Sequence, residues 1–144
     1  MAQQLFYEDV KEGMEILPRV VVCDTVSQAK WAGVNKDYSR YHYDKEYAVS
    51  IGLPNAIVNG TFKVAQLAQM LINWVGRGGT VSKLSWQLRK MDIVNDTMTF
   101  KGTISKCVKK DGEHLVECEV WGENPKGERT VFGTALVTLP SRSR

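Results

Sequence analysis

The chain has 144 residues, of which 43% are hydrophobic and 24% charged, as expected for one globular domain spanning residues 1–144. The net charge of +3 comes from 19 basic and 16 acidic residues, and the basic residues are dispersed, so neither nucleic-acid binding nor intrinsic disorder is indicated. Three cysteines without a CxxC spacing argue against a disulfide framework or a zinc site and favour a reducing compartment.

The N-terminal sequence lacks the basic and apolar regions of a secretion signal. The longest apolar stretch, residues 64–75, is interrupted by Gln66, Gln69 and Asn73 and is too short and too polar to span a bilayer. We therefore expect a cytoplasmic protein that has no membrane association.

The first half of the chain predicts one strand and two short helices. Residues 16–23 are rich in β-branched side chains and predict a strand. Thr25 followed by Gln28 fits a capping box, which predicts a short helix ending near Gly33. After a polar, tyrosine-rich loop, Asp44 is suited to cap a second short helix, which ends at Gly52.

The longest predicted helix begins at Asn59-Gly60-Thr61 and ends before Gly76. Its side chains are apolar around most of its circumference, and only a narrow stripe is polar, at Lys63, Gln66 and Asn73. Such a helix is typically buried.

The rest of the chain alternates with period two, starting with Leu84, Trp86 and Leu88 on one face, and predicts four strands. Turn-like sequences separate them at Asn95-Asp96, Asp111-Gly112 and 124–127, which predicts an antiparallel meander. An antiparallel sheet of about five strands wrapped around one long central helix is an α+β hot-dog fold. One small sheet cannot cover so apolar a helix, so we expect two sheets to join edge to edge in a dimer.

The chain contains two histidines. His114 lies beside the Asp111-Gly112 turn and is expected to be solvated. His42 shares a loop with Asp37 just ahead of the long helix, a common setting for catalytic groups. Spacing alone also allows a structural interpretation, in which Asp37 caps a turn and His42 bonds to backbone.

Residues 36–48, KDYSRYHYDKEYA, followed by Gly52 and Asn59-Gly60, resemble the motif of the MaoC-like family of (R)-specific enoyl-thioester hydratases and dehydratases. Its catalytic Asp and His fall on Asp37 and His42. The chain is also similar to the small hydratase subunits of steroid side-chain degradation, which work beside a second hot-dog subunit. Four positions depart from the family motif, namely Lys36, Ser39, Arg40 and Asn59.

The resemblance implies (R)-specific hydration of a trans-2-enoyl-CoA to a 3-hydroxyacyl-CoA, or the reverse dehydration. Asp37 and His42 would hold the water, and the Gly60 amide at the helix start would hold the thioester oxygen. Tyr38, Tyr41, Asn59 and Phe62 are candidate substrate-binding residues. Other candidates are Leu67 and Trp86 for the acyl chain, and Lys36, Arg40, Lys83, Arg89 and Lys90 for the coenzyme A phosphates.

The sequence has no Gly-rich phosphate loop, metal-ligand cluster or nucleophilic Ser-His arrangement, so we expect no metal and no cofactor beyond the thioester carrier, which is coenzyme A or an acyl-carrier protein. The expected partner is a second hot-dog subunit, in a homodimer or a heteromer. Two alternatives stay open, a hot-dog acyl-CoA thioesterase and a non-catalytic acyl-CoA-binding subunit of a heteromeric hydratase.

Overall fold

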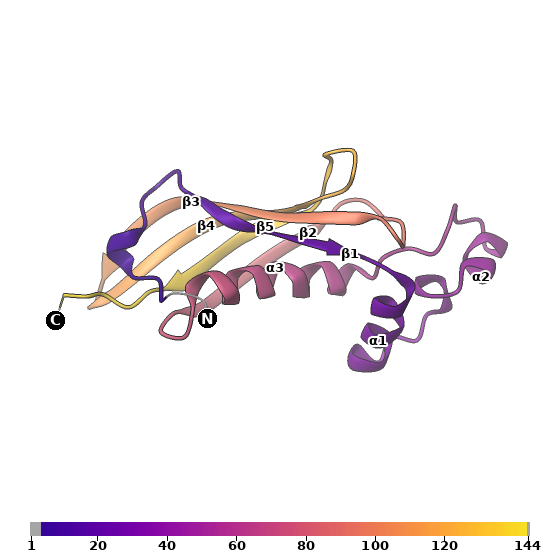
Figure 1. Cartoon of the computed structure of the whole chain (residues 1–144), viewed down its shortest axis with the longest axis horizontal. Coiled ribbons are helices and arrows are strands. Elements are labelled where there is room, and N and C mark those ends of the chain that lie inside the picture. The colour runs from indigo at the N-terminus through magenta and orange to yellow at the C-terminus, as the bar shows by residue number, and fades with distance from the viewer. Residues whose placement is uncertain (1–3, 144) are drawn as a thin grey trace.

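The computed structural model describes residues 4–143, and a five-stranded antiparallel sheet lies along one side of a single long helix, α3 (Gly60–Val75; Figure 1). The strand order is β1-β3-β4-β5-β2. The predicted α+β hot-dog fold is therefore confirmed. The strands are β1 (Glu15–Val22), β2 (Thr80–Leu88), β3 (Thr97–Lys110), β4 (Glu113–Glu123) and β5 (Arg129–Thr138).

The strand order shows that the predicted four-strand meander is wrong. β3, β4 and β5 are sequential neighbours, but β2 pairs with β5 at the edge opposite β1. The predicted turn at Asn95-Asp96 does form, with Asn95 at φ 79°. However, the backbones of both residues bond to Cys23, which follows β1. The turn therefore directs β3 alongside β1 rather than alongside β2.

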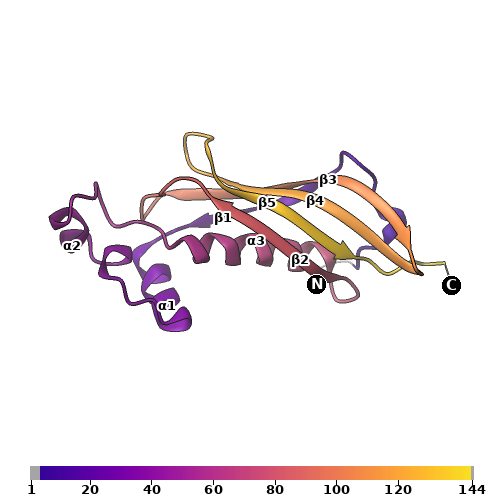
Figure 2. The same ribbon diagram turned by 180° about the vertical axis from the view of Figure 1, so that it is seen from behind.

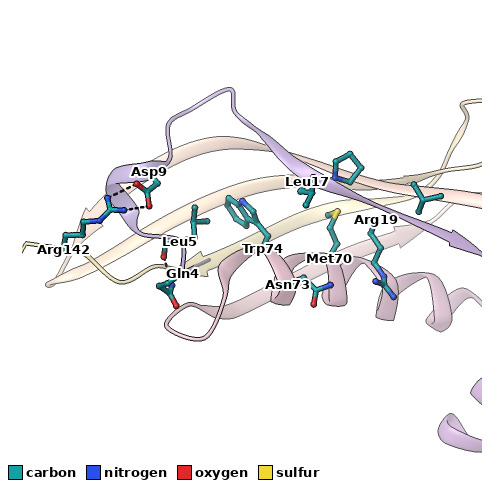
Figure 3. A pocket seen from close by; sticks show the side chains of 11 residues that line it. Gln4, Leu5, Asp9, Leu17, Arg19, Met70, Asn73, Trp74 and Arg142 are labelled. Carbon is teal, nitrogen blue, oxygen red and sulfur yellow. Dashed lines mark hydrogen bonds and ion pairs between the residues drawn. The ribbon is translucent and has the colours of Figure 1, made fainter. Parts of the chain in front are cut away.

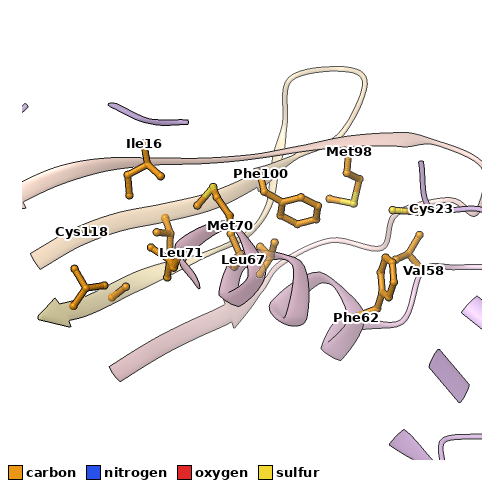
Figure 4. Packing of buried hydrophobic residues seen from close by; sticks show 14 of the residues in the cluster. Ile16, Cys23, Val58, Phe62, Leu67, Met70, Leu71, Met98, Phe100 and Cys118 are labelled. Carbon is orange, nitrogen blue, oxygen red and sulfur yellow. The ribbon is translucent and has the colours of Figure 1, made fainter. Parts of the chain in front are cut away.

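The core lies between α3 and the inner face of the sheet (Figure 4). Leu67 and Leu71 of α3 are fully buried, as are Met98 and Phe100 of β3. Burying each large apolar side chain contributes about 1.5–3 kcal/mol relative to leaving it exposed. The coverage of α3 is nevertheless incomplete, because Ile72 is 54% exposed.

Two polar residues are more buried than the sequence predicts. Lys63, assigned to the polar stripe of the long helix, is only 2% exposed because its ammonium pairs with Asp92 inside the protein. His114 is half-buried because the N-terminal segment folds back over it, and the Tyr7 ring centroid lies 4.9 Å from the imidazole.

The segment between β1 and α3 forms short helices beyond the N-terminal end of α3 (Figures 1 and 2). They are α1 (Thr25–Asn35), η2 (Arg40–His42) and α2 (Lys45–Ser50), while η1 (Tyr7–Asp9) lies near the chain start. The predicted cap of α2 is confirmed, because Asp44 accepts a hydrogen bond from the Tyr47 amide at 3.0 Å. Within residues 4–143, no helix has the length and apolarity needed to cross a membrane.

The predicted capping box of α1 is wrong. Asp24, one residue earlier than Thr25, caps the helix by accepting a hydrogen bond from the Ser27 amide at 2.7 Å. Gln28 instead turns inward, is 1% exposed, and accepts a hydrogen bond from the backbone amide of Asn59 at 2.9 Å. The predicted partner in a local cap thus joins α1 to the start of α3.

Candidate functional site

Asp37 and His42 meet at the N-terminal end of α3. Asp37 follows the left-handed residue Lys36 (φ 57°), which ends α1, and His42 is the last residue of η2. Asp37 Oδ2 lies 3.6 Å from His42 Nε2. This separation is too long for a direct hydrogen bond, but it leaves both atoms available to one small molecule between them.

The tautomer of His42 follows from its second ring nitrogen. Nδ1 lies 2.8 Å from the carbonyl oxygen of Ile57, which can only accept a hydrogen bond. Nδ1 therefore carries the proton, and in the neutral imidazole Nε2 presents a lone pair toward Asp37. His42 is 7% exposed, and the Tyr41 ring centroid lies 4.5 Å from its own. The imidazole is thus fixed in place.

Asp37 is held as a carboxylate by its neighbours. Its Oδ1 accepts hydrogen bonds from the Ser39 hydroxyl at 2.6 Å and the Ser39 amide at 3.2 Å, while Oδ2 accepts one from Asn59 Nδ2 at 2.8 Å. Hydrogen bonds from Ser39 chiefly, with smaller contributions from Asn59 and the nearby His42, lower the pKa of the Asp37 carboxyl below its usual 3.8. The side chain remains 39% exposed and accessible to a ligand.

Asn59 caps α3 and has a fixed orientation. Its Oδ1 accepts hydrogen bonds from the Thr61 amide at 2.9 Å and the Thr61 hydroxyl at 2.6 Å. Because the Thr61 amide can only donate, the Asn59 amide nitrogen must face Asp37. Trp31 and Asn35 of α1 both donate to the Thr61 hydroxyl at 3.0 Å, so α1 supports this arrangement.

Gly60 is the first residue of α3, and no residue among those described accepts a hydrogen bond from its amide. Free amides at a helix start favour negative charge. A Cβ at this position would meet the Cδ1 atom of Leu88, the end of a flexible and half-exposed side chain. The glycine thus allows β2 and any bound ligand to approach the helix start closely.

The other predicted binding residues fall into two groups. Tyr38, which is 63% exposed, and the half-buried Tyr41 lie beside the dyad in the same loop. Phe62 and Leu67 are buried in the core. Trp86 is 49% exposed on edge strand β2, so it does not line an interior tunnel of the isolated chain.

The candidate phosphate-binding cations differ in their partners. Arg40 is paired with Asp44 and Lys90 with Glu128, while Arg89 bonds to Gln87 and lies over the Phe132 ring. Within residues 4–143, neither Lys36 nor Lys83 has a carboxylate within ion-pair distance. These two lysines are the more available for an anionic ligand.

A cavity of about 700 Å³ lies away from the dyad (Figure 3). It is bounded by β1, the C-terminal half of α3 and the two ends of the described chain, with Leu17, Met70 and Trp74 among its lining residues. Neither this cavity nor a smaller one of about 290 Å³ includes Asp37 or His42.

The structure shows the turn at Asp37 and the backbone bond from His42 that the structural interpretation allowed, but the partners in three supporting contacts were not predicted. The spacing of Asp37 and Ser39 is typical of a local turn in which the carboxylate bonds two residues ahead, and this signal was available in the sequence. By contrast, the bonds from His42 to Ile57 and from Asn59 to Gln28 join residues that are 15 and 31 positions apart. No local pattern indicates contacts of that range.

No protein-family model matches this chain, and neither does any curated protein sequence. The solved structures that it resembles include (R)-hydratase PhaJ1 from Pseudomonas aeruginosa, with a TM-score of 0.88 and 16% identity over 96% of this chain and 88% of that one. A MaoC-like dehydratase from Rhodospirillum rubrum gives 0.82 and 18%, over 97% and 99% of the two chains. The ChsH1-ChsH2 complex from Mycobacterium tuberculosis gives 0.77 and 22%, over 90% and 98%. The resemblance to MaoC-like proteins is thus confirmed as a shared fold.

Proposed function

We propose that this chain catalyses (R)-specific addition of water to a trans-2-enoyl thioester, or the reverse dehydration, with Asp37 and His42 as its catalytic residues. The observation that carries the proposal is the 3.6 Å separation of Asp37 Oδ2 and His42 Nε2. With a neutral imidazole both atoms are hydrogen-bond acceptors, because Asp37 is ionised at neutral pH and the bond to Ile57 puts the ring proton on Nδ1. One water molecule can donate a hydrogen bond to each of them.

A water molecule held this way directs an oxygen lone pair outward to C3 of the enoyl group. As the new C3–O bond forms, the electrons of the C2–C3 double bond move toward the thioester carbonyl, and one water proton passes to the dyad. The dyad then returns that proton to C2, so the net reaction adds one water molecule. Positioned acid–base groups of this kind typically contribute about 10²–10⁴-fold to a rate.

The developing negative charge on the thioester oxygen needs a donor, and the Gly60 amide is the best candidate. It is free of protein acceptors in the described chain and stands at the N-terminus of the 16-residue helix α3. Removing one such donor typically costs about 2.7–4 kcal/mol of transition-state stabilisation. Lys36 adjoins Asp37 in the sequence and has no ion-pair partner within residues 4–143, so it is the first candidate to contact a phosphate of coenzyme A or of a carrier protein.

We also propose that a second hot-dog subunit, in a homodimer or a heteromer, pairs with the β2 edge. β2 has only one neighbouring strand, and Trp86 and Leu88 on it are about half exposed. Ile72 on α3 is exposed as well. Edge strands with exposed apolar side chains are usually covered. Leu88 also touches Gly60, so a subunit on this edge would adjoin the proposed oxyanion site.

The test is an assay of the purified chain with short, long and steroid enoyl-CoA thioesters, alone and with a candidate partner subunit. A hydratase removes the absorbance of the conjugated thioester without releasing free thiol. A thioesterase releases coenzyme A, which a thiol-reactive dye detects. Acyl-CoA binding without any turnover, with or without a partner, would contradict the proposal and favour a non-catalytic subunit.

A further inference from the structure

An ion pair is buried inside the protein close to the start of α3. The ammonium of Lys63, one turn into α3, donates to Asp92 Oδ2 at 2.7 Å and to the Lys90 carbonyl at 2.9 Å. The Thr130 hydroxyl of β5 donates to the same Asp92 oxygen at 2.6 Å. Lys63, Asp92 and Thr130 are each at most 2% exposed.

Stability is a weak explanation for this cluster. Burying two charges has a desolvation cost that often equals or exceeds their attraction, and well-packed apolar pairs are commonly as stable. Asp92 Oδ1 is also buried without a hydrogen-bond partner in the structure, which adds to the cost. A cluster of this kind is better explained by the geometry that it imposes on its surroundings.

The backbone of Asp92 is bonded to the segment that supports the dyad. Its carbonyl accepts a hydrogen bond from the Val58 amide at 2.8 Å, and the next residue, Ile93, forms an antiparallel bridge with Ile57. Ile57 in turn supplies the carbonyl that fixes the His42 ring. Asp92 is therefore joined through its backbone to the support of His42.

The side chain of Asp92 is bonded to the other half of the site. Through Lys63 it holds the first turn of α3, which begins with the Gly60 amide and is capped by Asn59, the residue that holds Asp37. Thr130 anchors the same loop to the sheet, because its carbonyl accepts hydrogen bonds from the amides of residues 89 and 90. The ion pair thus connects the support of His42, the start of α3 and the sheet.

We propose that Lys63 and Asp92 are positioning residues, whose ion pair sets the start of α3 relative to the His42 ring. The proposal rests on the hydratase function proposed above. Neither side chain reaches the reacting atoms. Their effect on the reaction arises from the distances among Asp37, His42 and the Gly60 amide. A small displacement of reacting groups is enough to slow an enzyme by about 100-fold.

The test compares the Lys63→Met/Asp92→Leu double variant with wild type. The double variant removes both charges and leaves no unpaired ion, so it keeps the test valid even where Lys63→Met alone does not fold. The expected result is a folded protein with KM within about two-fold of wild type and kcat about 10- to 100-fold lower. The matched control is Lys101→Met/Glu123→Leu, which removes the ion pair between β3 and β4 and should leave kcat unchanged.

A double variant that does not fold, that keeps kcat within two-fold of wild type, or that loses activity through KM alone would overturn the positioning role. Failure of the proposed function is separately visible, because wild type itself would then hydrate no enoyl-CoA. In that case the His42 imidazole NMR signals test whether the ion pair positions the ring. The proposal predicts that the Nδ1 proton signal shifts and exchanges faster with water in the double variant, and an unchanged signal overturns it.

Discussion

Asn59 Nδ2 lies 2.8 Å from Asp37 Oδ2, so the side chain that caps α3 also holds the carboxylate of the proposed dyad. Oδ1 of the same side chain accepts a hydrogen bond from the Thr61 backbone amide. One residue thus sets the position of Asp37 relative to the helix start that carries the Gly60 amide.

These two roles of Asn59 are separable by substitution. Ser is about as good an N-cap as Asn but is too short to keep the bond to Asp37. Asn59→Ser should therefore lower kcat by about ten-fold and cost about 1 kcal/mol of unfolding free energy, because only the bond to Asp37 is lost. Asn59→Ala should lower kcat similarly and cost about 1 kcal/mol more, because the cap is lost as well. Chemical denaturation and enoyl-CoA kinetics check both, and wild-type kcat in Asn59→Ser would contradict the role in holding Asp37.

Ser39 is the largest cause of the lowered pKa of Asp37, so Ser39→Ala should raise that pKa toward 3.8. A carboxyl whose pKa is lower in the folded than in the unfolded state stabilises the fold at pH values above its unfolded-state pKa. This stabilisation is lost as the pH falls through the folded-state pKa. The stability difference between wild type and Ser39→Ala should therefore be present at neutral pH and vanish in acid. A carboxyl ¹³C NMR titration measures the pKa directly. Ser105→Ala, on an exposed strand position, is the control and should leave it unchanged.

Lys36 has a left-handed backbone at the end of α1, with φ 57° and ψ 28°. Such a conformation costs a non-glycine residue about 1–2 kcal/mol. Lys36→Gly should therefore raise the melting temperature by about 2–4 °C, and it should raise KM for coenzyme A thioesters if the ammonium binds a phosphate. Lys36→Ala, which removes the ammonium but keeps a Cβ and with it the cost of the left-handed backbone, separates the two effects. A melting temperature lower in Lys36→Gly than in wild type would contradict the backbone argument.

The free edge of β2 predicts where a second subunit binds. Trp86→Glu puts a charge on that edge and should shift the assembly toward monomer in sedimentation experiments. Val20→Glu puts the same charge on β1, the opposite edge, where Val20 is 64% exposed, and should leave the assembly intact. Dissociation by Val20→Glu but not by Trp86→Glu would contradict the proposed edge.

The sequence predicts those features that depend on local pattern. The apolar run after Asn59-Gly60 predicts α3, Asp44 predicts the start of α2, and the period-two alternation predicts the strands. The place of β2 beside β5 was not predictable, because it depends on how a connection crosses the sheet. The inward turn of Lys63 was not predictable either, since its partner Asp92 lies 29 positions away.

For the candidate site, the sequence identifies Asp37, His42, Asn59 and Gly60, and the structure brings these four together at one end of α3. The sequence could not show which other residues hold these four in place. The carbonyl of Ile57 and the side chain of Gln28 reach the site through the tertiary fold alone. Residues that differ from the family motif still support the dyad, because Ser39 and Asn59 both donate to Asp37.

The proposed role of Asp37 is tested most directly by the hydration rate of the Asp37→Asn variant, measured with the enoyl-CoA on which wild type is most active and under conditions where both proteins are folded. Asparagine keeps the shape of the side chain but cannot accept the water proton. We expect a kcat at least about 100-fold lower, and a melting temperature somewhat below that of wild type because Ser39 and Asn59 lose their carboxylate partner. A folded Asp37→Asn variant that retains wild-type kcat would contradict the central claim that Asp37 acts on the water.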